Sequence, residues 1–374
     1  IDAYQQSIDR GLQVVTLSGN AGIGKTALTE HFLAWAAMQG ADVLHSRAFE
    51  TSGGLSYQPL SQLLRQRLEL ENAPEDLLSD FWLSQLTRLL PELRDRYPDL
   101  PAPTQDANVG QEHLFEAITR IVLALAARKP LLIAIDDWHW ADSASRDVLH
   151  YAIVRWSKEQ APIMLLLGLR QEAVAELPDV QQWLARLNQS LPVLPMRLKA
   201  LTQSETEQLI QRLLEPATAD AHHLARFSDW LFAESGGQPL FLAEMLKALV
   251  AEELVRPDEA TTSWQLDGER FEQVRAEGNG HITSGIQQII KGWLVRISHA
   301  ANEVLTAAAV LTQAGSFDQL FNVAEVDESE ALRALDELLN RQLLLETGGD
   351  VLSSRHEPTY TFSHQKVGEV VYLE

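Results

Sequence analysis

The segment GNAGIGKT, from Gly19 to Thr26, constrains this chain more than any other feature of its sequence. It fits the pattern G-x-x-x-x-G-K-[ST] in full. Glycines let successive backbone N–H groups turn inward around phosphate oxygens, and a helix that follows presents its positive end to them. The lysine can reach the β- and γ-phosphates, and the threonine hydroxyl can bind Mg²⁺. We therefore expect a phosphate-binding loop for ATP or ADP with Mg²⁺. Its expected residues are Gly19, Asn20, Ala21, Gly22, Ile23, Gly24, Lys25, Thr26 and Ala27.

The surroundings of this segment predict a strand before it and a helix after it. Leu12–Ser18 is an apolar, β-branched run, and Thr26–Gln39 has apolar residues at helical spacing. Further strands are expected at Ala41–Phe49, Leu131–Ile135 and Ile163–Leu169. Helices are expected between them at Pro59–Tyr97, Glu112–Arg128 and Ser143–Trp156. Strands that alternate with helices indicate an α/β domain with a parallel sheet covered on both faces.

The alternation of strands and helices ends at about Leu201, which indicates further domains. Ser204–Leu214 and Phe227–Val250 have helical patterns, whereas Arg256–Asn279 is polar, with little helical periodicity and a hairpin expected at Ser263–Leu266. The last region has three helical patterns followed by short strands near Leu343–Leu345 and Tyr360–Phe362, an order typical of a winged helix. We expect a P-loop nucleotide-binding domain at 1–198, a small helical domain at 199–284 and a winged-helix domain at 285–374.

A second candidate feature is the run LLIAIDD, Leu131 to Asp137. An acid after a buried strand lies at the carboxyl edge of the sheet, where open α/β sheets bind ligands. Asp136 is the expected acid on the Mg²⁺ side, and Asp137 is expected to orient the attacking water. The alternative is that such an acid caps the next helix.

Arg170 ends the strand Ile163–Leu169 and is a third candidate. A cation at this edge would face the γ-phosphate and help to stabilise the charge that develops there. The alternative is an ordinary surface arginine at a strand end. Lys25, Asp136, Asp137 and Arg170 are thus the expected catalytic residues, and Thr26 and Asp136 are the expected Mg²⁺ ligands.

The run IDDWHWADSASRDVL resembles the Asp-Asp-x-His-Trp-Ala-Asp segment of bacterial STAND-class ATPases, which are signal-transducing relatives of the AAA+ superfamily. Three further segments resemble that class in the same order: GGLSYQPL, GGQPLFLAEML and YTFSHQKVGEVVY. The resemblance covers nearly the whole chain. It implies a regulatory ATPase module of the kind found in LuxR-type and SARP-type transcription regulators.

The resemblance also implies roles for individual residues. Pro239 would pack on the adenine, although a proline at a helix start is common for structural reasons. His364 would reach the β-phosphate of ADP and hold the winged-helix domain on the nucleotide domain; alternatively, it is satisfied within its own domain. Trp138, His139 and Trp140 are expected to pack in the core rather than to catalyse.

This sequence departs from the STAND pattern in two places. The class has a Gly-Arg-Glu segment before the first helix, near the adenine, and this sequence begins at about that helix, so that contact is expected outside it. Most hydrolysing AAA+ motors have glutamate where Asp137 stands. Aspartate is one methylene shorter and reaches the water less well, which predicts slow turnover.

Composition limits the partners. The formal net charge of the 374 residues is −22, and phosphate-rich nucleic acid repels such a surface, so direct nucleic-acid binding by this segment is not expected. The sequence has no cysteine, which excludes disulfides and thiolate metal sites and is compatible with a cytoplasmic location. No apolar run is long enough to cross a membrane. Because the first residue is Ile1, targeting signals cannot be judged.

Together with the P-loop, the resemblance implies an ATP- and ADP-dependent switch that rests with ADP and assembles with ATP, with slow, regulatory hydrolysis. Its partners would be the nucleotide, effector and sensor domains outside this segment, and other copies of itself in an ATP-dependent homo-oligomer. Two alternatives stay open. One is an AAA+ loader or motor acting on DNA, and the other is a nucleotide-binding scaffold with negligible hydrolysis.

Overall fold

The computed structural model forms two compact units, Ile1–Leu198 and Lys199–Glu374. Each unit is described below by itself. The residues that the structure describes are 1–20, 22–49, 56–69, 71, 77–171, 174, 177–214, 221–257, 264–277, 290–295, 297–311, 315–324, 326–341, 343–347, 358–362 and 365–373.

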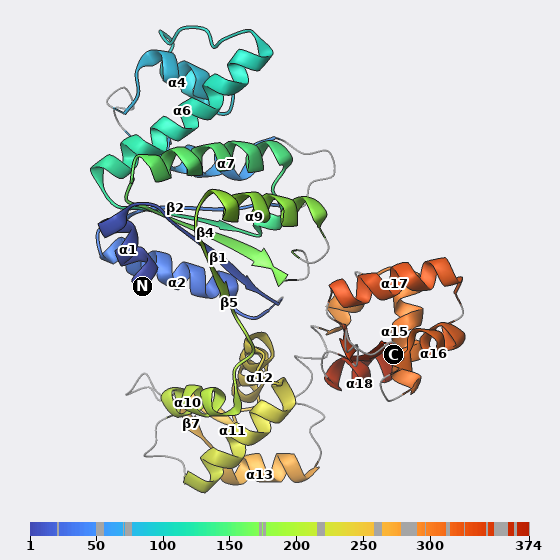
Figure 1. The fold of residues 1–374 in the computed structure, drawn as a ribbon. Helices are drawn as coiled ribbons and strands as arrows, with labels where there is room; N and C mark the ends of the chain where they lie inside the picture. Colours follow the sequence, from blue (N-terminus) through green and yellow to red (C-terminus); the bar gives the residue numbers. More distant parts are fainter. Residues whose placement is uncertain are drawn as a thin grey trace. The chain divides into compact units, whose positions relative to one another are not determined.

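A five-stranded parallel sheet organises the first unit (Figure 1). Its strands, in the order in which they lie, are β2 (Asp42–Arg47), β3 (Leu131–Asp136), β4 (Ile163–Arg170), β1 (Gln13–Gly19) and β5 (Val193–Arg197). The predicted parallel sheet is confirmed. Sequence analysis did not identify β5, because Pro195 lies within this edge strand and its apolar residues do not alternate with polar ones.

Helices cover both faces of the sheet. α1 (Asp2–Arg10) and α2 (Lys25–Met38) lie on one face, where Tyr4 and Leu33 contact the strands. The remaining helices contribute to a second cluster of buried side chains on the other face of the sheet. These are α3 (Gln58–Glu69), α4 (Asp80–Leu86), α5 (Glu92–Arg96), α6 (Ala107–Arg128), α7 (Ser143–Lys158) and α9 (Pro178–Ser190). Among them, α4 packs on α6 and α5 packs on α4. The predicted helices are therefore present, including α1 at the start of the sequence, and α9 is additional to them.

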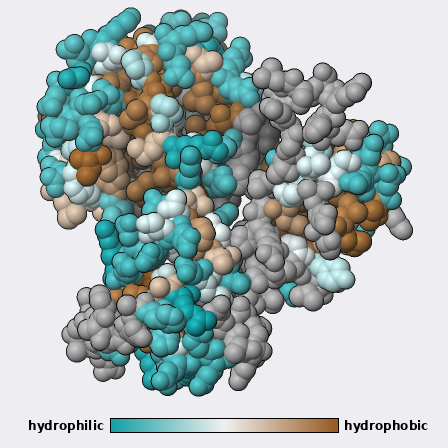
Figure 2. All heavy atoms as spheres, turned by 60° about the horizontal axis from the view of Figure 1, so that its bottom comes forward, coloured by the Kyte–Doolittle hydropathy of each residue, from teal (hydrophilic) through white to brown (hydrophobic). Residues whose placement is uncertain are grey.

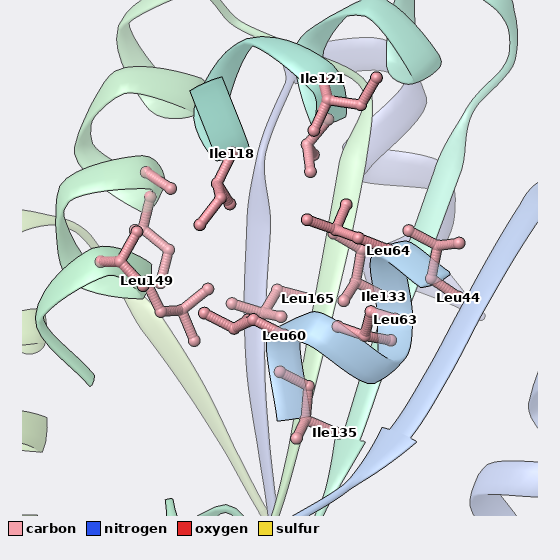
Figure 3. Packing of buried hydrophobic residues seen from close by; sticks show 14 of the residues in the cluster. Leu44, Leu60, Leu63, Leu64, Ile118, Ile121, Ile133, Ile135, Leu149 and Leu165 are labelled. Atoms are coloured by element: carbon pink, nitrogen blue, oxygen red, sulfur yellow. The ribbon is translucent and has the colours of Figure 1, made fainter. Parts of the chain in front are cut away.

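Strands β3 and β4 are buried on both sides, and their successive residues point to opposite faces of the sheet. Leu132 and Ala134 face α1 and α2, whereas Leu131, Ile133 and Ile135 belong to the larger cluster on the other face. Figure 3 shows leucine and isoleucine side chains of α3, α6 and α7 packed over this face of the sheet. Full burial of one such side chain stabilises the fold by about 1.5–3 kcal/mol. The apolar strand sequences thus fix the sheet at the centre of the unit.

The second unit begins with helices. They are α10 (Gln203–Leu213), α11 (Ala221–Ser235) and α12 (Pro239–Ala251), followed by the antiparallel pair β6 (Val255–Pro257) and β7 (Trp264–Leu266), and then α13 (Gly268–Glu277). The expectation that 256–279 has no regular helix was wrong at α13. One buried aromatic residue, Phe271, anchors this otherwise polar helix, since its ring lies 5.1 Å from Phe227 and 5.3 Å from Trp230. The predicted hairpin is present as β6 and β7, with Ser263 outside the described residues.

The remainder of the second unit alternates helices with a small antiparallel sheet. Its elements are α15 (His299–Leu311), β8 (Gly315–Ser316), α16 (Phe317–Val323), α17 (Glu328–Asn340), β9 (Leu344–Thr347), β10 (Thr359–Phe362) and α18 (Gln365–Leu373). The strands lie in the order β8-β10-β9. Ser316 and Gln319 form a capping box that starts α16 directly after β8.

The surface of the first unit is not uniformly polar. Figure 2 shows hydrophobic areas between hydrophilic ones on the face that it presents. In this unit Leu28, Leu194 and Met196 are exposed and line a groove of about 500 Å³ together with Trp35. Within the described part of the chain, no helix combines the length and apolar character needed to cross a membrane.

Candidate functional site

The loop between β1 and α2 has the backbone that its sequence predicts. Gly22 and Gly24 have φ angles of +74° and +93°, in the left-handed region that favours glycine. A Cβ on Gly19 would lie 2.9 Å from Ile23 Cγ2 and 3.1 Å from the Leu198 carbonyl oxygen, so only glycine fits there without a shift. A Cβ on Gly24 would meet no atom within 4 Å. The loop thus needs glycine at Gly24 for its conformation and at Gly19 for close packing.

Lys25 is the first residue of α2, and its side chain folds back over the loop. The Nζ donates hydrogen bonds to the carbonyl oxygens of Gly19 at 2.7 Å and Asn20 at 2.9 Å. Thr26 and Ala27, in the first turn of the same helix, are exposed. The ammonium and the helix start therefore lie at one open edge, where phosphate oxygens can reach both. Ala21, also predicted for this loop, lies outside the described residues.

Asp136 is the last residue of β3, and only 4% of it is exposed. Its Oδ2 lies 3.3 Å from Nε2 of His45, on the neighbouring strand β2. Gly168 of β4 makes room on the other side, because a Cβ there would lie 3.1 Å from Asp136 Oδ1. The carboxylate therefore lies between His45 of β2 and Gly168 of β4, in space that the missing side chain of Gly168 leaves open.

Asp137 follows directly, with φ +51° and ψ +37°, before the 3-10 turn η2 (Trp138–Trp140). It does not cap that turn with its side chain. Its Oδ2 accepts a hydrogen bond from Nε of Arg47 at 2.8 Å, and Nη2 of Arg47 lies 2.6 Å from the same oxygen in an ion pair. Its Oδ1 lies 3.6 Å from Nε of Arg170. Asp137 is thus held between guanidinium groups from β2 and β4.

His139 lies buried beside this cluster, with 3% of the residue exposed. Its Nδ1 accepts a hydrogen bond from the backbone N–H of Arg170 at 3.4 Å. Burial lowers the pKa of His139 to about 4; Asp137 raises it, and Arg170, Lys25 and Arg47 lower it. The imidazole is therefore neutral at pH 7. Its Nε2 is buried without a hydrogen-bond partner among the residues that the structure describes, and the ring packs on Trp140.

The strand order explains why these residues meet. β4 lies between β1 and β3, and its register pairs Arg170 with Gly19. Because parallel strands end at the same edge, the P-loop, the two aspartates and Arg170 all belong to the carboxyl edge of the sheet. Sequence reasoning missed His45 and Arg47, whose only signal was their position at the end of the expected strand Ala41–Phe49.

Two predicted residues lie elsewhere. Pro239 belongs to the second unit, where it is the first residue of α12, a position that suits proline because its missing N–H has no helical partner there. Its contact with adenine stays a prediction. His364 lies outside the described residues.

The oxygen ligands at this edge suit magnesium bound together with a nucleotide. Mg²⁺ prefers oxygen and is usually held by one or two protein groups plus substrate phosphates. Asp136 and Thr26 would supply a carboxylate and a hydroxyl. No group of three or more His, Cys, Asp or Glu side chains that could hold a metal alone occurs among the described residues. The donor set therefore fits a metal that arrives with phosphate.

Comparison with known proteins agrees with this geometry. Residues 1–166 match the protein family described as AAA ATPase domain. An uncharacterized protein of Rhizobium meliloti (strain 1021) is 28% identical over 209 residues, which are 55% of this chain and 17% of that protein. The chain thus matches only a small part of that much longer relative.

Two solved structures share the fold over nearly the whole chain. The ORC2 protein of Aeropyrum pernix, solved as ADPNP-ADP complexes, has a TM-score of 0.54 and 16% identity, with 99% of this chain and 90% of that chain covered. A Walker-type ATPase of Pyrococcus abyssi has a TM-score of 0.52 and 11% identity, with 98% and 93% covered. At these identities the likeness concerns the fold alone. Residues 1–166 thus resemble the AAA ATPase domain family, and they contain a P-loop suited to nucleotide binding.

Proposed function

We propose that this chain is a slow, regulatory ATPase of the STAND class that works as an ATP- and ADP-dependent switch. The observation that carries the proposal is the carboxyl edge of the first unit. There a glycine-rich loop and Lys25 lie on the same sheet edge as a buried aspartate and an aspartate held by two arginines. The loop binds the phosphates, and the aspartates supply the metal ligand and the water-orienting group.

Within this proposal each residue has one role. Lys25 would contact the β- and γ-phosphates, and Thr26 and Asp136 would hold Mg²⁺, which would neutralise charge on the phosphates. Asp137 orients the attacking water, and Arg170 stabilises charge at the γ-phosphate. Slow turnover follows from the short side chain of Asp137 and from its two arginine partners.

The second unit would contain the helical domain 199–284 and the winged-helix domain 285–374. The order α15-β8-α16-α17-β9-β10, with an antiparallel sheet β8-β10-β9, supports the winged-helix assignment, because helix, strand, two helices and two strands is the order of that motif. The helix start at Pro239 supports a role in packing on adenine, since a proline ring there is rigid and apolar.

His364 would hold the resting state by donating a hydrogen bond to the β-phosphate of ADP. Loss of one hydrogen bond to a charged group costs about 1.5–3 kcal/mol, which would shift the balance of closed and open forms about 10- to 150-fold. His364→Ala should therefore release ADP faster than the wild type. An unchanged ADP off-rate with an equal drop in melting temperature, with and without ADP, would return His364 to a structural role.

The test of the switch combines nucleotide identity, hydrolysis and assembly. We expect the purified chain to release ADP on denaturation, to hydrolyse ATP slowly in a single-turnover assay, and to gain mass by light scattering with a non-hydrolysable ATP analogue but not with ADP. Binding without hydrolysis would favour the scaffold. Salt-sensitive binding to duplex DNA would favour a loader or motor, against which the charge of −22 argues.

A further inference from the structure

Aromatic rings gather on the outer side of the helical layer that α4, α6 and α7 form in the first unit. α6 packs on both α4 and α7 (Figure 1). Phe81 of α4 and Tyr151 of α7 are 44% and 42% exposed, and Trp82 of α4 is partly exposed. One stripe of α6, with residues three or four positions apart, lies between these rings: Val109, His113, Glu116 and Arg120.

Contacts join the rings into one surface. The His113 ring lies 5.3 Å from the ring of Phe81 and 5.8 Å from that of Trp82. On the other side of the stripe, the Tyr151 hydroxyl donates a hydrogen bond to Oε2 of Glu116 at 2.9 Å. Single exposed apolar residues are ordinary on a protein, whereas a continuous set of them marks an interaction surface. We call this set, from Phe81 on α4 to Tyr151 on α7, the aromatic surface.

Arg120 shows which chemical group the aromatic surface binds. Its Cζ lies 4.7 Å from the centre of the Trp82 ring, within the range of a cation–π contact. Its Nε donates a hydrogen bond to Oε1 of Glu116 at 2.6 Å. An aromatic ring and a carboxylate thus hold one guanidinium together, and both groups attract arginine and lysine side chains.

The same two kinds of group recur on the aromatic surface beside Arg120. Asp80 directly precedes Phe81, and Asp147 lies one helical turn before Tyr151 on α7. Three exposed acids thus border the rings, one on each helix: Asp80, Glu112 and Asp147. None of the three forms an ion pair with another residue in the part of the chain that the structure describes. The surface therefore has an aromatic centre and an acidic border whose charges are not neutralised by a described cation.

We propose that the aromatic surface docks a basic segment of a partner protein, with apolar side chains on the rings and arginine or lysine side chains at the acidic border. Charge complementarity determines this choice, because the border attracts cations and the net charge of −22 steers a basic partner towards the chain. Single-stranded nucleic acid could stack on the rings, but the acids would repel its phosphates. The inference does not depend on the proposed ATPase function.

Calorimetry of the full chain with a synthetic amphipathic peptide tests the surface. The probe carries leucine and phenylalanine on one face and arginine on the other, and its counterpart carries glutamate in place of arginine. We expect only the arginine peptide to bind. Phe81→Ser and Tyr151→Ser should each weaken binding about 5- to 30-fold, as the loss of an aromatic anchor does. Both residues are exposed and lie on different helices, so each variant tests the surface by itself.

Two matched controls separate this surface from general attraction to an acidic chain. Leu194→Ser removes an apolar side chain that is 50% exposed elsewhere in the same unit, and it should leave the affinity unchanged. Glu112→Gln should weaken binding about two- to fivefold, the effect of one exposed charge. Glu30→Gln, which changes an exposed acid of α2, should bind the arginine peptide as the wild type does.

Fluorine NMR of the chain labelled with 5-fluorotryptophan locates the contact. The chain has nine tryptophans, and the variants Trp82→Phe and Trp35→Phe identify two of their signals. The arginine peptide should shift the signal of Trp82 and leave that of Trp35, which lines the groove beside α2, unchanged. A shift of Trp35 in place of Trp82 would overturn the inference. No binding of the arginine peptide, unchanged affinity in Phe81→Ser and Tyr151→Ser, or tighter binding of single-stranded DNA at this surface would overturn it as well.

Discussion

The P-loop and the aspartate cluster lie at the same edge of one sheet, yet they are built differently. The P-loop consists of consecutive residues whose glycines set the backbone, at φ +74° and +93°. The cluster around Asp137 takes one residue from the end of each of three strands, β2, β3 and β4, and Arg47 and Arg170 lie far apart in sequence. The first is therefore determined locally, and the second depends on correct pairing of the strands.

Lys25→Ala tests the P-loop and should have the largest effect. It removes the ammonium expected at the β- and γ-phosphates, and two hydrogen bonds to charged groups are worth about 3–6 kcal/mol. We expect ATP and ADP affinity to fall at least about 100-fold by calorimetry, with the sheet intact by circular dichroism. Unchanged affinity would falsify the P-loop assignment.

The pH dependence of stability tests the cluster around Asp137, because His139 is buried beside it. Its pKa of about 4 in the folded state lies below the ordinary value of 6.5. Between these pH values the unfolded chain takes up a proton that the folded chain refuses, so stability is lost as the pH falls from about 6.5 towards 4. The whole effect is about 3 kcal/mol.

His139→Phe removes this titration. Between pH 7 and pH 4 the mutant should therefore lose about 3 kcal/mol less unfolding free energy than the wild type, measured by urea unfolding. His31→Gln is the control, because His31 is exposed on α2 of the same unit. If the wild type and His139→Phe lose the same unfolding free energy as the pH falls, the prediction that His139 is neutral in the folded chain is wrong.

Asp137→Asn tests the chemistry of the cluster. The amide keeps the shape but cannot accept the water proton, so hydrolysis should slow about 100-fold, at the low end for general base catalysis. Binding of ATP and Mg²⁺ should remain, since Asp136 holds the metal in the proposed mechanism. A normal single-turnover rate would mean that Asp137 does not accept the water proton and has a role only in its contacts with the two arginines.

Gly24 and Gly40 separate the effect of backbone conformation from that of the P-loop, because both have a positive φ but only Gly24 lies in the P-loop. Gly24 and Gly40 have φ angles of +93° and +88°, and at neither would a Cβ meet an atom within 4 Å. Alanine at either position should cost about 1–2 kcal/mol of unfolding free energy. Only Gly24→Ala should also weaken ATP binding. Equal ATP affinity in both mutants would mean that the loop backbone contributes nothing specific to phosphate binding.

Arg170→Ala should have the smallest effect. Its proposed partner is the γ-phosphate alone, and its side chain is 42% exposed, so we expect the ratio of the ADP and ATP dissociation constants to fall only about two- to fivefold. A ratio that does not change would make Arg170 a partner of Asp137 and nothing more.

The same contrast explains what the sequence could predict. The P-loop, the buried strands and Asp136 follow from contiguous patterns, since an apolar run that ends in an acid has one plausible place in a parallel sheet. Arg47 was missed because nothing in the segment DVLHSR indicates that β2 lies beside β3. Strand β5 was missed because Pro195 interrupts it and its apolar residues do not alternate with polar ones, and α13 because its burial depends chiefly on Phe271.

The hydrogen bonds of Lys25 to its own loop have a consequence for nucleotide exchange. The ammonium donates to the carbonyl oxygens of Gly19 and Asn20 and so links the two ends of the loop from within. An incoming nucleotide must displace these internal acceptors, which lowers its net affinity by the energy of the bonds that are broken. In return, the same two bonds keep the ammonium beside the loop, so a phosphate that binds there meets a cation that is already in place.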